Sequence, residues 1–257
     1  MKPDPATFPF RLICLDETDS TNNYLTALCD SDGGVPELCT VVADFQSAGK
    51  GQRGNSWEGE KGKNLLFSFV LYPDFVKARE QFILSEIISL SVKEALDCRI
   101  ADVSVKWPND IYWQDKKICG MLIENVLNAE GGVARCIAGI GLNINQKAFV
   151  SDAPNPVSLS QITGQEEDLH AVLADVLLFV SRYYEDLKQD AEGFTQHLTE
   201  RYNQSLYRRE GVYPFRDAQG PFQASILRVE PDGRLHLLDT EGNERSYLFK
   251  EVQFIIS

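Results

Sequence analysis

Apolar residues recur along this chain with two different periods, and these periods predict the order of its elements. Helical spacing marks 82–96, 169–187 and a shorter helix between Phe194 and Leu206. The apolar runs that are typical of strands lie at 10–15, 39–45, 65–72, 103–105, 111–113, 117–126 and 134–144. Strands at this density with interleaved helices predict an α+β fold, in which a mixed β-sheet packs against helices.

The pattern changes near Gly211. From there on, short apolar runs are separated by turn signals at Gln219-Gly220, Pro231-Asp232-Gly233 and Glu241-Gly242-Asn243. This spacing predicts a small all-β unit, which we expect to be a barrel. The sequence therefore predicts two domains, a larger one over residues 1–208 and a small C-terminal β-barrel over residues 209–257.

Composition narrows the class of protein. The 257 residues are 43% hydrophobic and 25% charged, values that are ordinary for a soluble globular protein. No apolar stretch is long enough to span a bilayer, and the first residues lack the apolar core of a secretory signal. The six cysteines include no Cys-x-x-Cys pair, so we expect reduced thiols, a cytoplasmic protein and no zinc site.

The net charge limits the partners. A value of −13 argues against a protein that coats nucleic acid, because phosphate binding needs a basic surface. A phosphorylated substrate would therefore have to meet a local cationic patch. Only three histidines occur, so catalysis built on histidine is poorly supported.

Lys106 is the first candidate for such a patch. It ends an apolar strand, and Pro108-Asn109-Asp110 then turns the chain into a second strand. A cation held at a fixed corner can stabilise an anion during a reaction. A surface lysine beside a hairpin turn explains the same residues, and they alone favour that simpler interpretation.

The loop from Gln46 to Trp57 is the second candidate. Its closely spaced glycines allow backbone N–H groups to approach an anion, and Lys50 and Arg53 add positive charge. Trp57 offers a flat face on which a ring can stack. The spacing matches neither a Walker loop nor a dinucleotide motif, and a plain surface loop remains the alternative.

Two further segments are ambiguous. Ser20 and Thr21 precede a helix and are expected as N-caps, although their hydroxyl groups could also hold a polar ligand. Gly139 to Asn145 ends a strand with glycines that permit close backbone approach, and Asn143 could bind the edge of a base. An ordinary strand exit explains this second segment equally well.

Taken together, these segments resemble the catalytic core of biotin protein ligases. The motifs that carry the resemblance, in the order and spacing of that family, are Glu17–Asn22, Gln46–Trp57, Val105–Asp110, Lys117–Glu124 and Gly139–Asn145. The C-terminal β unit also matches. The resemblance implies an enzyme that adenylates biotin with ATP and Mg²⁺, then transfers biotin to one lysine of a biotin carboxyl carrier protein.

The resemblance also implies roles for individual residues. Lys106 would lie between the biotin carboxylate and the α-phosphate, with Arg53 as a second catalytic cation. ATP would meet Lys50, Arg53, Trp57, Lys106 and Asn143, with Trp57 against the adenine. The residues implied for biotin are Ser20, Thr21, Asn22, Gln46, Gly49, Lys50, Gly51, Gln52, Lys106 and Gly120.

This loop departs from the family in two places. Lys50 stands where arginine is usual, which keeps the charge but loses a bidentate fork. Gln52 often aligns with arginine too, so its family role is in doubt, and Arg53 is the neighbouring substitute. Because the catalytic motifs begin by residue 17, we expect no N-terminal helix-turn-helix domain and no DNA binding.

The chemistry supports the resemblance independently. A carboxylate that attacks an α-phosphate brings two anions together, so cations have to neutralise both. The alternatives are a lipoate or octanoate ligase with the same fold, and a non-catalytic biotin sensor. We also expect that the C-terminal barrel helps to grip ATP or the carrier domain, and that an exposed sheet edge allows a homodimer.

Overall fold

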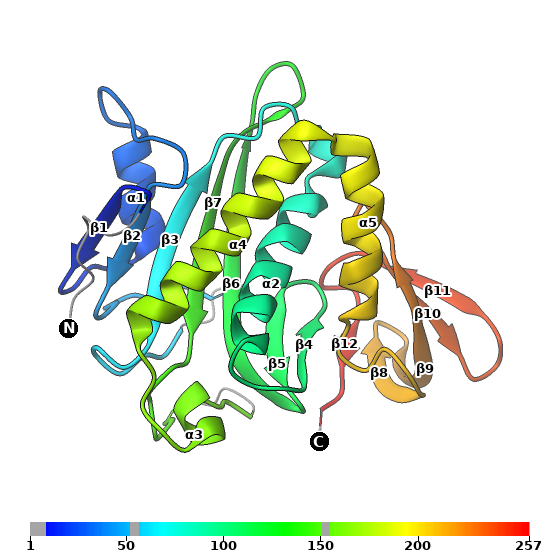
Figure 1. Ribbon diagram of the computed structural model, residues 1–257. Coiled ribbons are helices and arrows are strands. Elements are labelled where there is room, and N and C mark those ends of the chain that lie inside the picture. Colours follow the sequence, from blue (N-terminus) through cyan, green and yellow to red (C-terminus); the bar gives the residue numbers. More distant parts are fainter. Residues whose placement is uncertain (1–8, 52–56, 151–154, 257) are drawn as a thin grey trace.

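Two β-sheets, each packed against helices, make up the computed structural model (Figure 1). It describes residues 9–51, 57–150 and 155–256. The larger sheet has seven strands in the order β1-β2-β3-β7-β6-β5-β4, and the smaller has five in the order β11-β10-β9-β8-β12. The expected α+β fold with a mixed sheet is therefore confirmed.

In the larger sheet, β1 runs parallel to β2 and the other neighbouring strands are antiparallel. Its strands are β1 (Leu12–Leu15), β2 (Thr40–Ala43), β3 (Leu65–Leu71), β4 (Val103–Lys106), β5 (Asp110–Trp113), β6 (Lys116–Leu127) and β7 (Val133–Leu142). The glycines of β6 and β7 fall in register, because Gly120 pairs with Gly141. This pairing leaves a strip without side chains on one face of the sheet.

Helices cover the two faces of this sheet unequally. The helices are α1 (Thr21–Cys29), a 3₁₀ turn η3 (Ala78–Glu80), α2 (Phe82–Asp97), α3 (Leu159–Thr163), α4 (Leu169–Gln189) and α5 (Ala191–Gln204). In Figure 1, α2 and α4 lie across one face of the sheet, and α1 lies at the β1–β2 side. One face is thus closed by long helices, while the short α1 contacts β2, β3 and β7 on the opposite face.

Strand β3 shows how the sequence produces these layers. All seven of its residues are buried, because helices or strands cover both of its faces. Phe67 and Phe69 pack into the main core with α2 and α4, whereas Val70 packs with Leu25 of α1. Ser68 lies on the α1 side of this apolar strand, where it meets other polar groups.

The smaller sheet follows α5 and consists of β8 (Tyr213–Asp217), β9 (Gly220–Val229), β10 (Leu235–Asp239), β11 (Glu244–Tyr247) and β12 (Gln253–Phe254). Its strand pairs are antiparallel. The C-terminal β unit is thus confirmed, but no pairing of the described residues joins the edge strands β11 and β12 into a closed barrel. The boundary at residues 208 and 209 remains a prediction.

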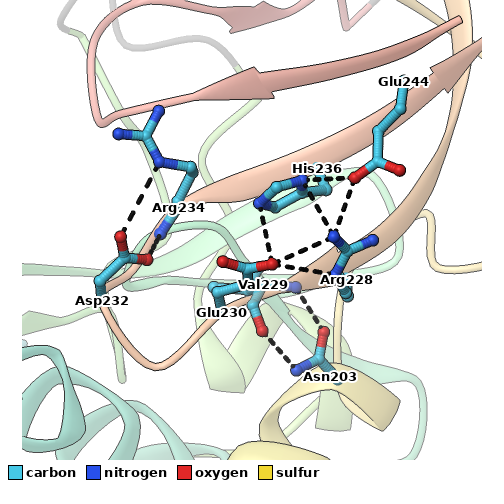
Figure 2. Close-up of polar contacts among 8 residues, drawn as sticks. All are labelled: Asn203, Arg228, Val229, Glu230, Asp232, Arg234, His236 and Glu244. Atoms are coloured by element: carbon cyan, nitrogen blue, oxygen red, sulfur yellow. Dashed lines mark hydrogen bonds and ion pairs between the residues drawn. The ribbon is translucent and has the colours of Figure 1, made fainter.

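Asn203 of α5 attaches the smaller sheet to the helices (Figure 2). Its Nδ2 donates to the carbonyl of Val229 at 3.0 Å, and the N–H of Val229 donates to its Oδ1 at 2.7 Å. Beyond this junction, Arg228 contacts both Glu230 and Glu244 on the outer surface of the sheet. The connection between the two sheets is therefore a specific pair of hydrogen bonds with a charged surface cluster beside it.

Sequence and structure differ mainly at the ends of elements. The strand predicted from residue 10 begins at Leu12, and the helix predicted between Phe194 and Leu206 spans Ala191–Gln204. The short α3 was not predicted, although Ser158 and Gln161 form a capping box at its start.

All six cysteines are free thiols. Among the described residues, no helix is long and apolar enough to cross a bilayer.

Candidate active site

A narrow cleft, here called the sheet cleft, lies over the glycine strip on the α1 side of the larger sheet. Its volume is about 50 Å³. The start of α1, the loop from Gln46 to Trp57 and the strands β6 and β7 contribute to it. The predicted site residues that line it are Ser20, Thr21, Asn22, Gln46, Lys50, Gly51, Trp57 and Gly120. The structure thus brings together residues that lie up to a hundred positions apart in the sequence.

The start of α1 supplies the first group of polar side chains. Ser20 occupies the N-cap position, but its side chain makes no capping hydrogen bond. The expectation that Ser20 and Thr21 cap the helix is therefore wrong for their side chains. Each is only 3% exposed, and both line the cleft instead of closing the helix end.

A chain of hydrogen bonds fixes these side chains. The N–H and Oγ1 of Thr21 donate to Gln46 Oε1 at 2.7 and 3.1 Å. Ser68 Oγ lies 2.7 Å from Thr21 Oγ1 and 2.6 Å from Asn22 Oδ1. Asn22 Nδ2 donates to Glu124 Oε2 at 2.6 Å. Because each side chain is held by a neighbour, the cleft presents a preorganised set of donors and acceptors.

Trp57 fills much of the sheet cleft. A Cβ atom on Gly120 would lie 2.6 Å from the indole Cζ3, and one on Gly141 would overlap the indole Cε2. The indole therefore lies flat where both strands lack side chains. Its Nε1 is buried and has no hydrogen-bond partner within the described part of the chain. The strip of glycines is wide enough for a planar bicyclic ring, since it already holds one.

Lys106 lies farther out on the same face. It ends β4 opposite Asp110, and its Nζ lies 5.5 Å from the ring centroid of Tyr112 and 5.1 Å from that of Phe254 in β12. Burial lowers the pKa of its ammonium group; Asp110 opposes this shift, and Lys117 and Arg208 add to it. Lys106 is thus a half-buried cation between aromatic rings, and it has no ion pair among the described residues.

Lys117 is a second lysine of the site, and no role was predicted for it. Its Nζ contacts Asp110 Oδ2 at 2.8 Å and lies 5.8 Å from the Trp57 ring centroid. A Cβ atom on Gly120 would be 3.2 Å from this Nζ. Lys117 is therefore a cation that borders the volume now filled by the indole. Both lysines share Asp110 as their nearest acidic neighbour.

The glycine-rich loop is described only in part. Gly51 lines the cleft, and Lys50 Nζ donates to Asn23 Oδ1 at 2.8 Å. A Cβ atom on Gly49 would lie 3.0 Å from the carbonyl oxygen of Trp57, so the loop packs closely there. The predicted residues Gln52 and Arg53 lie outside the described residues.

Asn143 lies just beyond the cleft, after β7. Its Nδ2 donates to the carbonyl of Val157 at 3.2 Å, which fixes the amide. Its Oδ1 is buried and has no partner among the described residues. An oriented, unpaired acceptor of this kind suits an amino group on a ligand.

Three contributors to the site were not predicted from the sequence. Lys117 is hidden among the neighbouring charges Asp115 and Lys116. Ser68 and Glu124 hold Asn22 in place. The signal for Ser68 was present, since it is one polar residue inside the apolar run Leu65–Leu71. Glu124 gave no such signal, because an acidic residue in a strand is ordinary on an exposed face.

Comparisons with known proteins agree with this geometry. The model of the biotin/lipoate A/B protein ligase family matches residues 15–145. The bifunctional ligase/repressor BirA of Bacillus spizizenii is 30% identical over 244 residues, covering 92% of this chain and 72% of the relative. The biotin--[acetyl-CoA-carboxylase] ligase of Paracoccus denitrificans is 33% identical over 162 residues, covering 60% of this chain and 65% of the relative.

A solved structure extends the similarity to the whole fold. The biotin protein ligase of Aquifex aeolicus, in complex with biotin and ATP, has a TM-score of 0.76 and 29% identity. The similarity covers 96% of this chain and 99% of that one, so it includes both sheets. The chain belongs to the biotin/lipoate A/B protein ligase family.

Proposed function

We propose that this protein is a biotin protein ligase. It joins biotin to ATP to form biotinyl-5'-AMP and then transfers the biotinyl group to a lysine of a biotin carboxyl carrier protein. The observation that carries this proposal is the sheet cleft, in which a glycine strip wide enough for a bicyclic ring faces a fixed set of amide and hydroxyl groups. The biotin and ATP in the similar Aquifex aeolicus structure support it.

Biotin recognition is assigned to the start of α1 and to the first part of the glycine-rich loop. A ureido ring has one carbonyl acceptor and two N–H donors, so it needs both kinds of partner. The Ser20 hydroxyl can donate, the Thr21 hydroxyl already donates to Gln46 Oε1 and can accept, and the Asn22 and Gln46 amides carry both kinds of group. Gly49, Lys50, Gly51, Gln52 and Gly120 complete the proposed biotin set. The ligand ring takes the place of the Trp57 indole over the strip.

The first step forms one bond and breaks one. A biotin carboxylate oxygen attacks the α-phosphorus of ATP, and the bond to the bridging oxygen of pyrophosphate breaks. Both reactants are anions, so the step needs nearby positive charge. Lys106 and Lys117 supply it on the described part of the site, and Lys50 and Arg53 are proposed to add to it.

ATP is proposed to lie beyond the carboxylate end of biotin. Trp57, once displaced from the strip, offers its face to the adenine, and Asn143 offers an unpaired oxygen to an amino group. No group of three or more acidic, histidine or cysteine side chains that could hold a metal occurs among the described residues. Mg²⁺ therefore fits best as part of the Mg–ATP substrate, bound to its phosphates.

The second step consumes the adenylate. The amino group of the carrier lysine attacks the acyl carbon, AMP leaves, and the nitrogen loses a proton. Water would compete for the same carbon, so the cleft has to be closed until the carrier arrives. We infer that the glycine-rich loop closes it and that the smaller sheet, whose Phe254 already contacts Lys106, helps to hold ATP or the carrier.

Other partners remain proposals. The net charge of −13 supports a protein that does not bind DNA. The edge strand β1 is proposed to pair with a second copy to form a homodimer. Val105 of β4, at the other edge, already exchanges backbone hydrogen bonds with Ser205 and Tyr207. A cytoplasmic location is still a prediction.

Two measurements test the function. Purified protein is incubated with biotin, Mg–ATP and a carrier domain, and pyrophosphate release and labelled biotin transfer are followed separately. We expect both reactions with biotin and neither with lipoate. Pyrophosphate release with lipoate alone would make the protein a lipoate ligase, and a folded protein that binds biotin without releasing pyrophosphate would make it a sensor.

A further inference from the structure

A second cleft, here called the helix cleft, lies in the helical layer on the other side of the larger sheet. It is bordered by the segment after β3, the start of α2, the end of α4 and the first half of α5. Its volume is about 510 Å³, which is the size of a small-molecule site. None of the residues proposed to bind biotin or ATP lines it.

The walls of the helix cleft are mostly apolar. Phe75, Ile83 and Leu187 contribute large side chains, and Pro231 reaches it from the turn between β9 and β10. Phe75 is 42% exposed, so part of its ring is open to a ligand. An apolar wall with an exposed ring favours a ligand that has an aliphatic body.

A buried carboxyl group faces this apolar space. Glu86 of α2 lines the cleft and is only 1% exposed. Thr199 Oγ1 of α5 donates to its Oε2 at 2.9 Å. Its Oε1 has no hydrogen-bond partner among the described residues. A buried carboxyl with one free oxygen is costly unless something else binds it.

The surroundings of Glu86 define what could bind there. Burial raises its pKa to about 8, and the Thr199 hydrogen bond opposes that shift only in part. The other titratable groups facing this region are Lys77 and Glu80 before α2, and Glu192 and Tyr202 on α5. Glu80 is already paired with Arg79, and Tyr202 donates to the carbonyl of Pro108. Glu192 therefore adds a second carboxylate at the cleft.

We propose that the helix cleft is a binding site for an alkylammonium group, with the amine against Glu86 and the aliphatic chain along Phe75, Ile83 and Leu187. An ammonium donates to the free oxygen and supplies the opposite charge that a buried carboxylate lacks. The Phe75 ring can add a cation–π contact at the opening. The source of the amine is either a free diamine or polyamine, or a lysine side chain of a partner.

The site is separate from the proposed chemistry. The sheet cleft opens on the α1 side, whereas Glu86 projects from α2 into the helical layer. Binding at the helix cleft is therefore expected without biotin or ATP. A failure of ligase activity would leave this proposal intact, and the reverse also holds.

Calorimetric titration with hexylamine tests the proposal, with hexanol as the neutral ligand of matched length. We expect hexylamine to bind the full chain at least tenfold more tightly than hexanol. Because the Glu86 carboxyl ionises when the amine binds, the measured heat should depend on the ionisation enthalpy of the buffer. Equal binding of hexanol, or no binding of hexylamine by the folded protein, would overturn the proposal.

Two variants locate the binding. Glu86→Gln keeps the shape and should weaken hexylamine binding roughly tenfold or more while leaving hexanol unchanged. Glu200→Gln is the matched control, since it removes the same charge from an exposed position of α5 outside the cleft. If Glu86→Gln fails to fold, Thr195→Trp fills the cleft from a half-buried position and should abolish binding. Binding that survives the blocking variant would also refute the site.

The same titration distinguishes the two sources of the amine. Spermidine is compared with Nα-acetyl-lysine methylamide, which carries a lysine side chain without a free α-amino group. Tighter binding of spermidine supports a site for a free polyamine. Tighter binding of the lysine derivative supports a lysine side chain of a protein partner. Failure of both, together with hexylamine, would show that internal packing alone accounts for Glu86.

Discussion

The two clefts of this protein differ in volume and in whether their polar groups already have partners. The helix cleft is about ten times larger than the sheet cleft, with about 510 Å³ against about 50 Å³. In the sheet cleft, Thr21 bonds to Gln46, Ser68 lies between Thr21 and Asn22, and the Trp57 indole fills the space over the glycine strip. In the helix cleft, one carboxyl oxygen is left without a partner.

The sheet cleft is small because one of its own side chains, Trp57, fills it. The sheet cleft is recognised as a candidate binding site because polar groups converge over a strip of glycines. Its volume alone would not have identified it. The helix cleft is identified by the opposite feature, a polar atom that nothing in the described chain satisfies. Reaction rates and biotin affinity therefore report on the sheet cleft, and stability and amine binding report on the helix cleft.

The largest effect is expected from the two lysines of the sheet cleft. Lys106→Ala and Lys117→Ala should each lower the rate of pyrophosphate release by about 10²–10³-fold, which is typical for loss of one preorganised charge. Lys117 borders the ring space, so its loss should also weaken biotin binding, whereas loss of Lys106 should leave biotin binding nearly unchanged. Single-turnover kinetics and biotin titration measure the two effects.

The control for this pair is Lys188→Ala, which removes a lysine of α4 that is paired with Glu37 and Glu185 at the surface. It should leave both reactions unchanged. An unchanged rate in both site variants would remove the electrostatic basis of the proposed first step.

A smaller effect, on stability, is expected at Glu86. Its folded pKa of about 8 lies above the ordinary value of 4.5, so the folded state prefers the protonated form. The wild type should therefore lose stability as pH rises from about 4.5 through about 8, by a few kcal/mol. In Glu86→Gln the side chain cannot ionise, so this variant should lose less stability between about pH 4.5 and about pH 8. Urea unfolding at pH 5, 7 and 9 measures the difference, and parallel pH profiles for both proteins would contradict the raised pKa.

A smaller effect, on biotin affinity, is expected from a substitution in the glycine strip. In Gly141→Ala the new methyl group overlaps the Trp57 indole and forces it away from β7. Overpacking of this kind costs about 1–3 kcal/mol, so biotin affinity should fall roughly tenfold or more. The displaced indole should also shift the tryptophan emission to longer wavelength. That shift should be absent in a Trp57→Phe background, where Trp107 and Trp113 are the remaining tryptophans.

The smallest effect is expected where the smaller sheet is attached. Asn203→Ala leaves the N–H and carbonyl of Val229 without their partners, which should cost about 1–2 kcal/mol of stability. The sheet cleft lies elsewhere, so biotin affinity should be unchanged. The helix cleft shares α5 and Pro231 with this junction, so hexylamine binding should weaken. A loss of biotin affinity instead would mean that the two clefts are coupled.

Local patterns of residues were enough to predict the order of the main helices and strands. Apolar periodicity is local, so helices 82–97 and 169–189 and the buried strand 65–71 could be recognised from neighbouring residues alone. The roles expected for Ser20, Gln46 and Gly120 came instead from the resemblance to biotin protein ligases. All three residues line the sheet cleft.

Only the tertiary structure decided which atoms meet. Strand register placed Gly120 beside Gly141 and put Lys117, not only Lys106, next to the ring space. The hydroxyl of Ser68 and the carboxylate of Glu124 meet Asn22 across 46 and 102 positions of sequence. Glu86 is hidden in an ordinary helical pattern, and its isolation follows from the packing of α5 against α2. Contacts of this kind depend on how layers stack, and no local pattern of residues encodes that.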